Sequence, residues 1–242
     1  MKIPVLGLIT ITALLNTVSV KAQTADEIIS KHIQAIGGKD KISQVKTLYL
    51  EGAMQVMGNE APTTTYVING KALKSEVNFN GQKIIQVVTD KSGWAVNPMQ
   101  GQSDPTPLPD DQLKAAQEEL DLGGQLFNYA AKGYKVELLG KEDVNGSSTF
   151  KIKVTSASAT QNTYYIDATT YYIDKTVTVA SVNGQSAETS SVYSDYQKTD
   201  VGYVIPYKTE LTLPQGFTLT TIVKKAELNK EIDPTIFDLP KK

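Results

Sequence analysis

Four Asn-Gly dipeptides divide the chain into segments in which apolar residues alternate with polar ones. They lie at Asn69-Gly70, Asn80-Gly81, Asn145-Gly146 and Asn183-Gly184. Asn and Gly both tolerate the positive φ angles of tight hairpin turns, so each dipeptide predicts a turn between two antiparallel strands. Repeated hairpins of this kind predict an antiparallel meander.

The alternation begins at Thr47 and, after one interruption, resumes from Lys135 to near Leu228. In TLYLEGAMQV and ALKSEVNF the apolar residues share one face of a strand: Leu48, Leu50, Met54 and Val56, then Leu73, Val77 and Phe79. Roughly ten strands follow from these patterns. Since a twisted sheet of that size curls or splits, we expect a mainly β fold with some α (α+β). Its centre is a single strongly curved antiparallel sheet, a half-barrel plugged by a few short helices.

A helix is predicted before the first strand. Thr24 and Glu27 have the spacing of a capping box. Four isoleucines at helical spacing form its apolar face, and Gly37-Gly38 end it; the isoleucines are Ile28, Ile29, Ile33 and Ile36. A second short helical turn is expected around Asp40 to Val45. The only histidine, His32, is expected at the surface or boundary of the first helix.

The interruption of the strand pattern is a helical insertion. A proline-rich stretch, Asn97 to Pro109, is expected to be a loop, since proline cannot continue a central strand. DDQLKAAQEEL then has helical spacing after an acidic first turn, and QLFNYAAKG indicates a second short helix after Gly123-Gly124. The insertion is either an ordinary covering element or a lid that moves when an acyl chain enters a cavity.

The stretch YYIDATTYYID, Tyr164 to Asp174, repeats four residues and predicts a hairpin. Asp167 at the first turn position can accept hydrogen bonds from backbone amides two residues on. Paired tyrosines then place one ring on each face of each strand. An aromatic binding platform is the alternative interpretation.

The first 22 residues have the pattern of a cleaved secretory signal peptide. Lys2 precedes an apolar run from Ile3 to Leu15, and Val20-Lys21-Ala22 fits a signal peptidase site. Residues 23–242 contain no linker-like stretch and are expected to form one domain. We therefore expect an exported, soluble protein.

The composition excludes several classes of function. The chain has no cysteine and one histidine, so a thiol nucleophile and a transition-metal site are not expected. Gly101 to Pro105 does not match the Gly-x-Ser-x-Gly nucleophile motif, and no phosphate loop occurs. All 24 basic residues are lysine, which argues against nucleic acid as a partner. We expect no catalytic residue, no metal and no cofactor.

Several motifs, in order, resemble those of LolA-like outer-membrane lipoprotein-sorting proteins. They are ADEIISKHIQAIGGKDKI, DKSGWAVNP, PLPDDQLK, NYAAKGYKVELLGKEDVNGSSTFKIKV, YYIDATTYYIDK and IDPTIFDLP. The resemblance implies an open curved sheet closed by helices, with a hydrophobic cavity that receives lipoprotein acyl chains and without catalytic residue or cofactor. Well-studied carriers of this family hold the lid helix closed with an arginine, which this sequence lacks.

The resulting expectation is a periplasmic, non-enzymatic carrier of lipid or lipoprotein acyl chains, monomeric and with envelope membrane proteins as further partners. Eight residues are predicted to line its cavity: Leu50, Met54, Phe79, Trp94, Leu113, Leu120, Leu126 and Phe127. One alternative is an envelope interaction or sensor module whose cavity is filled by its own side chains. A hydrolase is a third possibility.

Overall fold

The structure is a computed structural model that describes residues 23–56, 58–156, 161–182 and 185–240. The expected signal peptide, residues 1–22, and the turn expected at Asn183-Gly184 lie outside the described residues.

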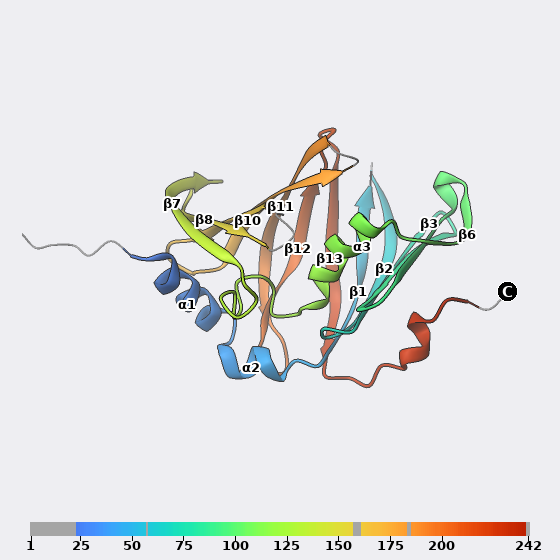
Figure 1. Cartoon of the computed structure of the whole chain (residues 1–242), viewed down its shortest axis with the longest axis horizontal. Coiled ribbons are helices and arrows are strands. Elements are labelled where there is room, and N and C mark those ends of the chain that lie inside the picture. Colours follow the sequence, from blue (N-terminus) through green and yellow to red (C-terminus); the bar gives the residue numbers. More distant parts are fainter. Residues whose placement is uncertain (1–22, 57, 157–160, 183–184, 241–242) are drawn as a thin grey trace, which may run out of the picture.

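The described residues form one open, curved antiparallel sheet of 13 strands (Figure 1). Its order is β6-β5-β4-β3-β2-β1-β13-β12-β11-β10-β9-β8-β7. Two meanders, β1 to β6 and β7 to β13, are thus joined where β1 pairs with β13, and β6 and β7 are the free edges. The strands are β1 (Thr47–Val56), β2 (Asn59–Ile68), β3 (Ala72–Phe79), β4 (Gln82–Thr89), β5 (Gly93–Asn97), β6 (Gln102–Pro107), β7 (Lys135–Val144), β8 (Ser147–Thr155), β9 (Gln161–Asp167), β10 (Ile173–Val182), β11 (Gln185–Lys198), β12 (Val204–Thr212) and β13 (Thr218–Leu228).

The register of the strands separates two faces of the sheet. Leu48 pairs with Val67 of β2 and with Leu228 of β13, and directly paired residues lie on the same face. We call this the inner face, because the N-terminal helices pack on it. The face that carries Tyr49 is the outer face. Figure 1 shows the sheet curving so that its edges, β6 and β7, stand on opposite sides of α3.

The helices begin and end where the sequence indicates. Thr24 Oγ1 accepts a hydrogen bond from Glu27 N at 3.2 Å, and Thr24 N donates to Glu27 Oε2 at 3.0 Å, which confirms the capping box. Gly37, with φ 130°, follows the end of the first helix. The helices are α1 (Ala25–Ala35), α2 (Lys39–Gln44) and α3 (Asp110–Gln117), and the 3-10 turns are η1 (Pro98–Gln100), η2 (Glu118–Leu120) and η3 (Pro234–Phe237).

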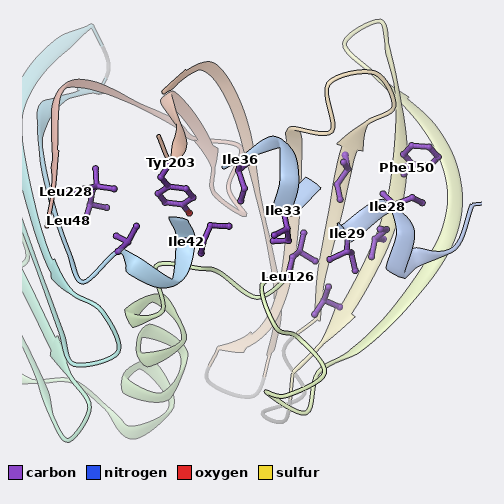
Figure 2. Close-up of a cluster of buried hydrophobic side chains, with 14 of the residues drawn as sticks. Ile28, Ile29, Ile33, Ile36, Ile42, Leu48, Leu126, Phe150, Tyr203 and Leu228 are labelled. Carbon is purple, nitrogen blue, oxygen red and sulfur yellow. The ribbon is translucent and has the colours of Figure 1, made fainter. Parts of the chain in front are cut away.

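The main core lies between α1, α2 and the inner face (Figure 2). The predicted isoleucine face of α1 is buried against Phe150, Ile152 and Val154 of β8 and Ile166 of β9. His32 corrects one expectation: it is only 4% exposed. Its burial follows from its position in α1, one residue before Ile33 and three after Ile29, on the side that faces the sheet.

A smaller second core lies on the outer face and includes the C-terminal turn. Trp94 of β5 packs with Ala72, Val87 and Phe237, and its Nε1 donates to the Phe237 carbonyl oxygen at 3.3 Å. Ile236 and Phe237 thus anchor the C-terminal turn to the outer face of the sheet.

Two of the Asn-Gly dipeptides form two-residue hairpin turns with positive φ at both positions. These are Asn80-Gly81, with φ 52° and 81°, and Asn145-Gly146, with φ 50° and 87°. Asn69-Gly70 lies in a three-residue connection between β2 and β3. The Asp167 turn also forms as expected, since its Oδ1 accepts from Thr169 N at 2.9 Å and Thr170 N at 2.6 Å.

Two local expectations were wrong. The proline-rich stretch contains β6, because an edge strand can hold Pro105 and Pro107 without breaking a ladder on its free side. QLFNYAAKG is not a helix but a series of turns, in which Asn128 has φ 53°. Among the described residues, no helix is long and apolar enough to cross a membrane.

Candidate functional site

The segment from Leu108 to Tyr134 joins the two free edges of the sheet. It leaves β6 at one edge and enters β7 at the other, and Leu126 in the main core shows that it crosses the inner face. We call residues 108–134 the crossover. Its path decides how much of the inner face stays open.

The middle of the crossover is held by backbone groups near the β2–β3 turn. Gly70 N donates to the Leu120 carbonyl oxygen at 2.7 Å, and Leu122 N donates to Asn69 Oδ1 at 3.0 Å. The Tyr203 hydroxyl donates to the Leu122 carbonyl oxygen at 2.9 Å. Leu126 then enters the main core. The part of the crossover that follows α3 is therefore firmly attached.

α3 itself is attached more lightly. It has no buried residue. Its main apolar anchor is Leu113, which packs with Leu108 against Gly93 of β5: a Cβ atom at Gly93 would lie 2.7 Å from Leu108 Cδ1 and 3.0 Å from Leu113 Cδ1. At its C-terminal end, Gln117 Nε2 donates to the Thr89 carbonyl oxygen at 3.0 Å.

A pocket of about 530 Å³ lies between this segment and strands β9 to β11. Its volume is within the range of about 300–1,000 Å³ typical of small-molecule sites. Since Leu113 contacts β5 while Ala116 lines this pocket, α3 bridges the opening of the curved sheet. The lining residues are Gln112, Ala115, Ala116, Glu118, Glu119, Asp121, Gly124 and Gln125 from the crossover, and Asn162, Tyr164, Thr176, Thr178 and Tyr193 from the sheet.

A hydrogen-bond network forms part of the pocket wall. Asn162 Nδ2 donates to Gln125 Oε1 at 2.8 Å, and the Tyr164 hydroxyl donates to the same oxygen at 3.1 Å. Gln125 Nε2 donates to Glu118 Oε2 at 2.8 Å, and Thr178 Oγ1 donates to Asn162 Oδ1. This network joins the crossover to β9 and β10 and fixes the directions of the polar groups around the pocket.

The electrostatic character of the pocket is acidic. Its lining in the described part of the chain contains Glu118, Glu119 and Asp121 but no lysine. Asp121 forms an ion pair with Lys132. Glu119 keeps a solvent-exposed side chain, yet desolvation by the surrounding protein raises the pKa of its carboxyl. Burial likewise raises the pKa of the Tyr164 hydroxyl, which stays protonated as a donor.

The floor beneath the bridge is the inner face of the central strands. The register places Leu50 and Met54 of β1 on this face, opposite Ala226 and Thr221 of β13. Phe79 of β3 is on the same face, two residues after Val77. All three predicted residues are half-buried rather than enclosed. They therefore offer apolar surface beyond the polar wall of the pocket.

The other predicted cavity residues are not gathered at one site. Leu126 is buried in the main core and Phe127 packs against it, while Leu120 is buried beside the β2–β3 turn and Leu113 lies against Gly93. Trp94 is a correction, because the register puts it on the outer face, where the C-terminal turn covers it.

The sheet residues of the pocket were missed by the sequence interpretation. Asn162, Tyr164 and Ile166 alternate along β9 and share the inner face, but only Ile166 is apolar. One sequence signal could have indicated these residues: Ile166 is apolar and lies two positions after Tyr164, so both belong to the same face of the strand. Read alone, the polar positions suggest a solvent-facing surface.

A second depression, of about 380 Å³, lies on the outer face beside Tyr49 and Tyr66. All of its lysines are already in ion pairs, for example Lys74 with Glu76 at 2.9 Å and Lys230 with Glu227 at 2.8 Å. Within the described ranges, no group of three or more acidic or histidine side chains is arranged to hold a metal ion. The inner pocket is the stronger candidate.

Comparisons with known proteins identify the fold. A DUF1329 family protein from Desulfovibrio piger is 13% identical with a TM-score of 0.59, covering 90% of this chain and 98% of its own. A LolA superfamily protein from Nitrosomonas europaea is 13% identical with a TM-score of 0.58, and the match covers 90% of this chain and 98% of that protein. A protein from Vibrio parahaemolyticus, described as an outer membrane lipoprotein-sorting protein domain, is 12% identical with a TM-score of 0.55. The match covers 88% of this chain and 95% of that protein.

These similarities show that the chain has a LolA-like fold, as the sequence motifs indicated. No protein-family model matches the sequence, and no curated protein matches it.

Proposed function

We propose that this protein is a non-enzymatic binding protein that carries the acyl chain of a lipid or lipoprotein between the crossover and the inner face of its sheet. The observation that carries the proposal is the lightly attached bridge formed by α3 over a pocket of about 530 Å³. The LolA-like fold supports the same function, since one protein of similar structure is described as a lipoprotein-sorting domain.

The inner face offers a place for the chain of such a ligand. Half-buried Leu50, Met54 and Phe79 lie on the central strands, between the β5 contact of α3 and the pocket at β9 to β11. Transfer of an acyl chain from water contributes about 0.8 kcal/mol per buried methylene. Such burial needs no catalytic group. The apolar surface becomes accessible to the ligand when α3 moves away from Gly93.

The cellular setting belongs to the same proposal. The N-terminal sequence pattern supports export to the periplasm, where a carrier would take a lipid or lipoprotein from one membrane and deliver it to another. Envelope membrane proteins would then be its donor and acceptor partners. A protein of this kind works as a monomer of residues 23–242.

The test is to fill the pocket. Ala116 lines it, whereas Lys114 on the same helix is exposed and is not part of its lining. The Ala116→Trp and Lys114→Trp variants therefore differ mainly in whether the indole enters the pocket. The protein and both variants are purified without detergent from a periplasm, extracted with organic solvent and analysed by mass spectrometry.

The proposal predicts acylated species in stoichiometric amount with the unchanged protein and Lys114→Trp, and a strong reduction with Ala116→Trp. Uptake of a fluorescent fatty alcohol by protein stripped of lipid provides a second readout. Absence of both co-purified lipid and uptake would overturn the proposal. An interaction module would then explain the fold better.

A further inference from the structure

Thr176 has a hydroxyl group without a hydrogen-bond partner in the part of the chain that the structure describes. The residue is only 8% exposed, and its side chain is one of the walls of the inner pocket. Register with Tyr164 on β9 and Ser191 on β11 places it on the inner face. Leaving a buried hydroxyl unpaired is unfavourable, so a ligand atom that pairs with it gains an advantage.

Three neighbouring polar side chains already have partners. Thr178 donates to Asn162, and Asn162 and Tyr164 donate to Gln125. Among the described residues of this wall, Thr176 Oγ1 is therefore the buried side-chain atom left without a partner. Across the pocket, Glu119 adds a carboxyl group to a lining that contains no lysine among the residues that the structure describes.

We propose that this wall is a head-group subsite that accepts hydroxyl or amine groups and rejects carboxylates and phosphates. The inference rests on the proposed function, because it specifies which chain-bearing ligands the protein takes. A hydroxyl or ammonium group can donate to the oxygens of Thr176 and Glu119. Lys132 already balances the charge of Asp121. An anionic head would still stand beside Glu118 and Glu119, and the described lining residues include no lysine.

The proposal separates ligands of equal chain length. A lipid with a free amine, or a neutral lipid with a hydroxyl, would be retained, whereas a free fatty acid would bind poorly. The apolar contribution is similar for all of them, so the difference in affinity reports on how the head group is accommodated, and variants of the wall assign it to the subsite.

The experiment is a competition assay with lipid-stripped protein. The uncharged fluorophore N-phenyl-1-naphthylamine reports occupancy, and dodecan-1-ol, dodecylamine and dodecanoate compete with it below their aggregation concentrations at neutral pH. We expect the alcohol and the amine to displace the reporter at concentrations about tenfold or more below that of dodecanoate, equivalent to about 1.4 kcal/mol.

Two variants locate the preference. Thr176→Val keeps the shape of the side chain and removes its hydroxyl, so the alcohol and the amine should bind several-fold more weakly. Glu119→Gln removes a charge from the pocket and should reduce the ratio between the displacing concentrations of dodecanoate and dodecylamine. Asp143→Asn removes the same charge from exposed β7 and should leave that ratio unchanged.

Different outcomes separate this inference from the proposed function. If neither the reporter nor any competitor binds, the proposed function fails. If all three competitors bind alike, or dodecanoate binds best, the head-group subsite is overturned while lipid binding stands. Equal effects of Glu119→Gln and Asp143→Asn would also overturn it, because overall charge would then explain the preference. Glu119 is exposed, so its variant tests the subsite even if Thr176→Val fails to fold.

Discussion

The Nδ1 atom of His32 lies 2.8 Å from the carbonyl oxygen of Tyr171, and this contact ties α1 to the turn between β9 and β10. Since a carbonyl oxygen only accepts, Nδ1 carries the hydrogen. Burial lowers the pKa of His32, and the hydrogen bond to Tyr171 opposes this to a smaller extent. The buried ring is therefore neutral near pH 7.

This contact predicts a loss of stability in mild acid. The pKa of His32 in the folded protein is below its ordinary value of 6.5. As the pH falls below 6.5, the unfolded chain takes up the proton before the folded one, so the free energy of unfolding decreases towards the folded pKa. Urea unfolding between pH 7.5 and pH 5 measures this decrease.

A His32→Phe variant provides the comparison. It keeps an aromatic ring, loses about 1 kcal/mol at pH 7 with the missing hydrogen bond, and removes the titrating group. The difference between the two proteins should shrink as the pH falls from 7.5 to 5. A difference that is constant across this range would show that His32 does not cause the acid sensitivity.

The Asp167 turn predicts a local stability effect with a clear chemical signature. Desolvation raises the pKa of Asp167, but hydrogen bonds from the backbone of Thr170 and Thr169 outweigh it, so the net pKa is lowered. Asp167→Ala removes these acceptor contacts and should lower the free energy of unfolding by about 1–3 kcal/mol at pH 7. Thermal and urea unfolding both measure the change.

Asp167→Asn is the matched variant, because its side-chain oxygen can still accept from the same amides. It should lose less stability than Asp167→Ala at pH 7. Because the folded pKa of Asp167 is below its ordinary value of 3.8, the aspartate's advantage over asparagine should disappear as the pH falls below 3.8. Equal losses in both variants would argue against a hydrogen-bonded turn.

Much of the fold could be predicted because its determinants are local. The Asn-Gly turns, the Thr24 cap and the alternation that begins at Thr47 each act within a few residues. The edge strand β6 could not be predicted in this way. Its prolines are compatible with a strand only because the strand has a single neighbour, and that is a property of the whole sheet.

The candidate site was harder to predict, since alternation distinguishes two faces without saying what covers each of them. Leu50 and Met54 were correctly given a common face, which proves to be the inner one. Trp94 lies on the opposite face, where Phe237, 143 residues later in the chain, covers it. Asn162 can lie on the covered face because Gln125, from a turn distant in sequence, accepts its hydrogen bond.

Substitution of Gly93 should loosen the bridge formed by α3 without changing the part of the pocket wall that the sheet supplies. A Cβ atom there would meet Leu108 Cδ1 at 2.7 Å and Leu113 Cδ1 at 3.0 Å, so Gly93→Ala must displace these side chains. Overpacking of this kind costs about 1–3 kcal/mol. We expect faster hydrogen exchange in residues 110–117, with little change in β9 and β10.

Leu113→Ala should give the same pattern of exchange by removing the anchor instead of displacing it. If α3 admits the ligand, both variants should also speed the release of a bound fluorescent fatty alcohol. Exchange in α3 that stays as slow as in the unchanged protein would show that Gly93 and Leu113 do not hold the bridge in place.

Trp94 supplies a spectroscopic test of the outer-face core, because it is the only tryptophan in the chain. Phe237→Ala should expose its ring, shift its emission to longer wavelength and lower the free energy of unfolding by about 3 kcal/mol. Leu239→Ala is the control, since Leu239 is 57% exposed and lies outside that core.

The same location predicts what ligand binding should do to this emission. A ligand in the inner pocket is on the other side of the sheet from Trp94, so saturation with dodecan-1-ol should leave the emission maximum unchanged. A shift of the size produced by Phe237→Ala would instead place the ligand near the C-terminal turn. The outer-face depression lined by Ile232 and Ile236 would then replace the inner pocket as the binding site.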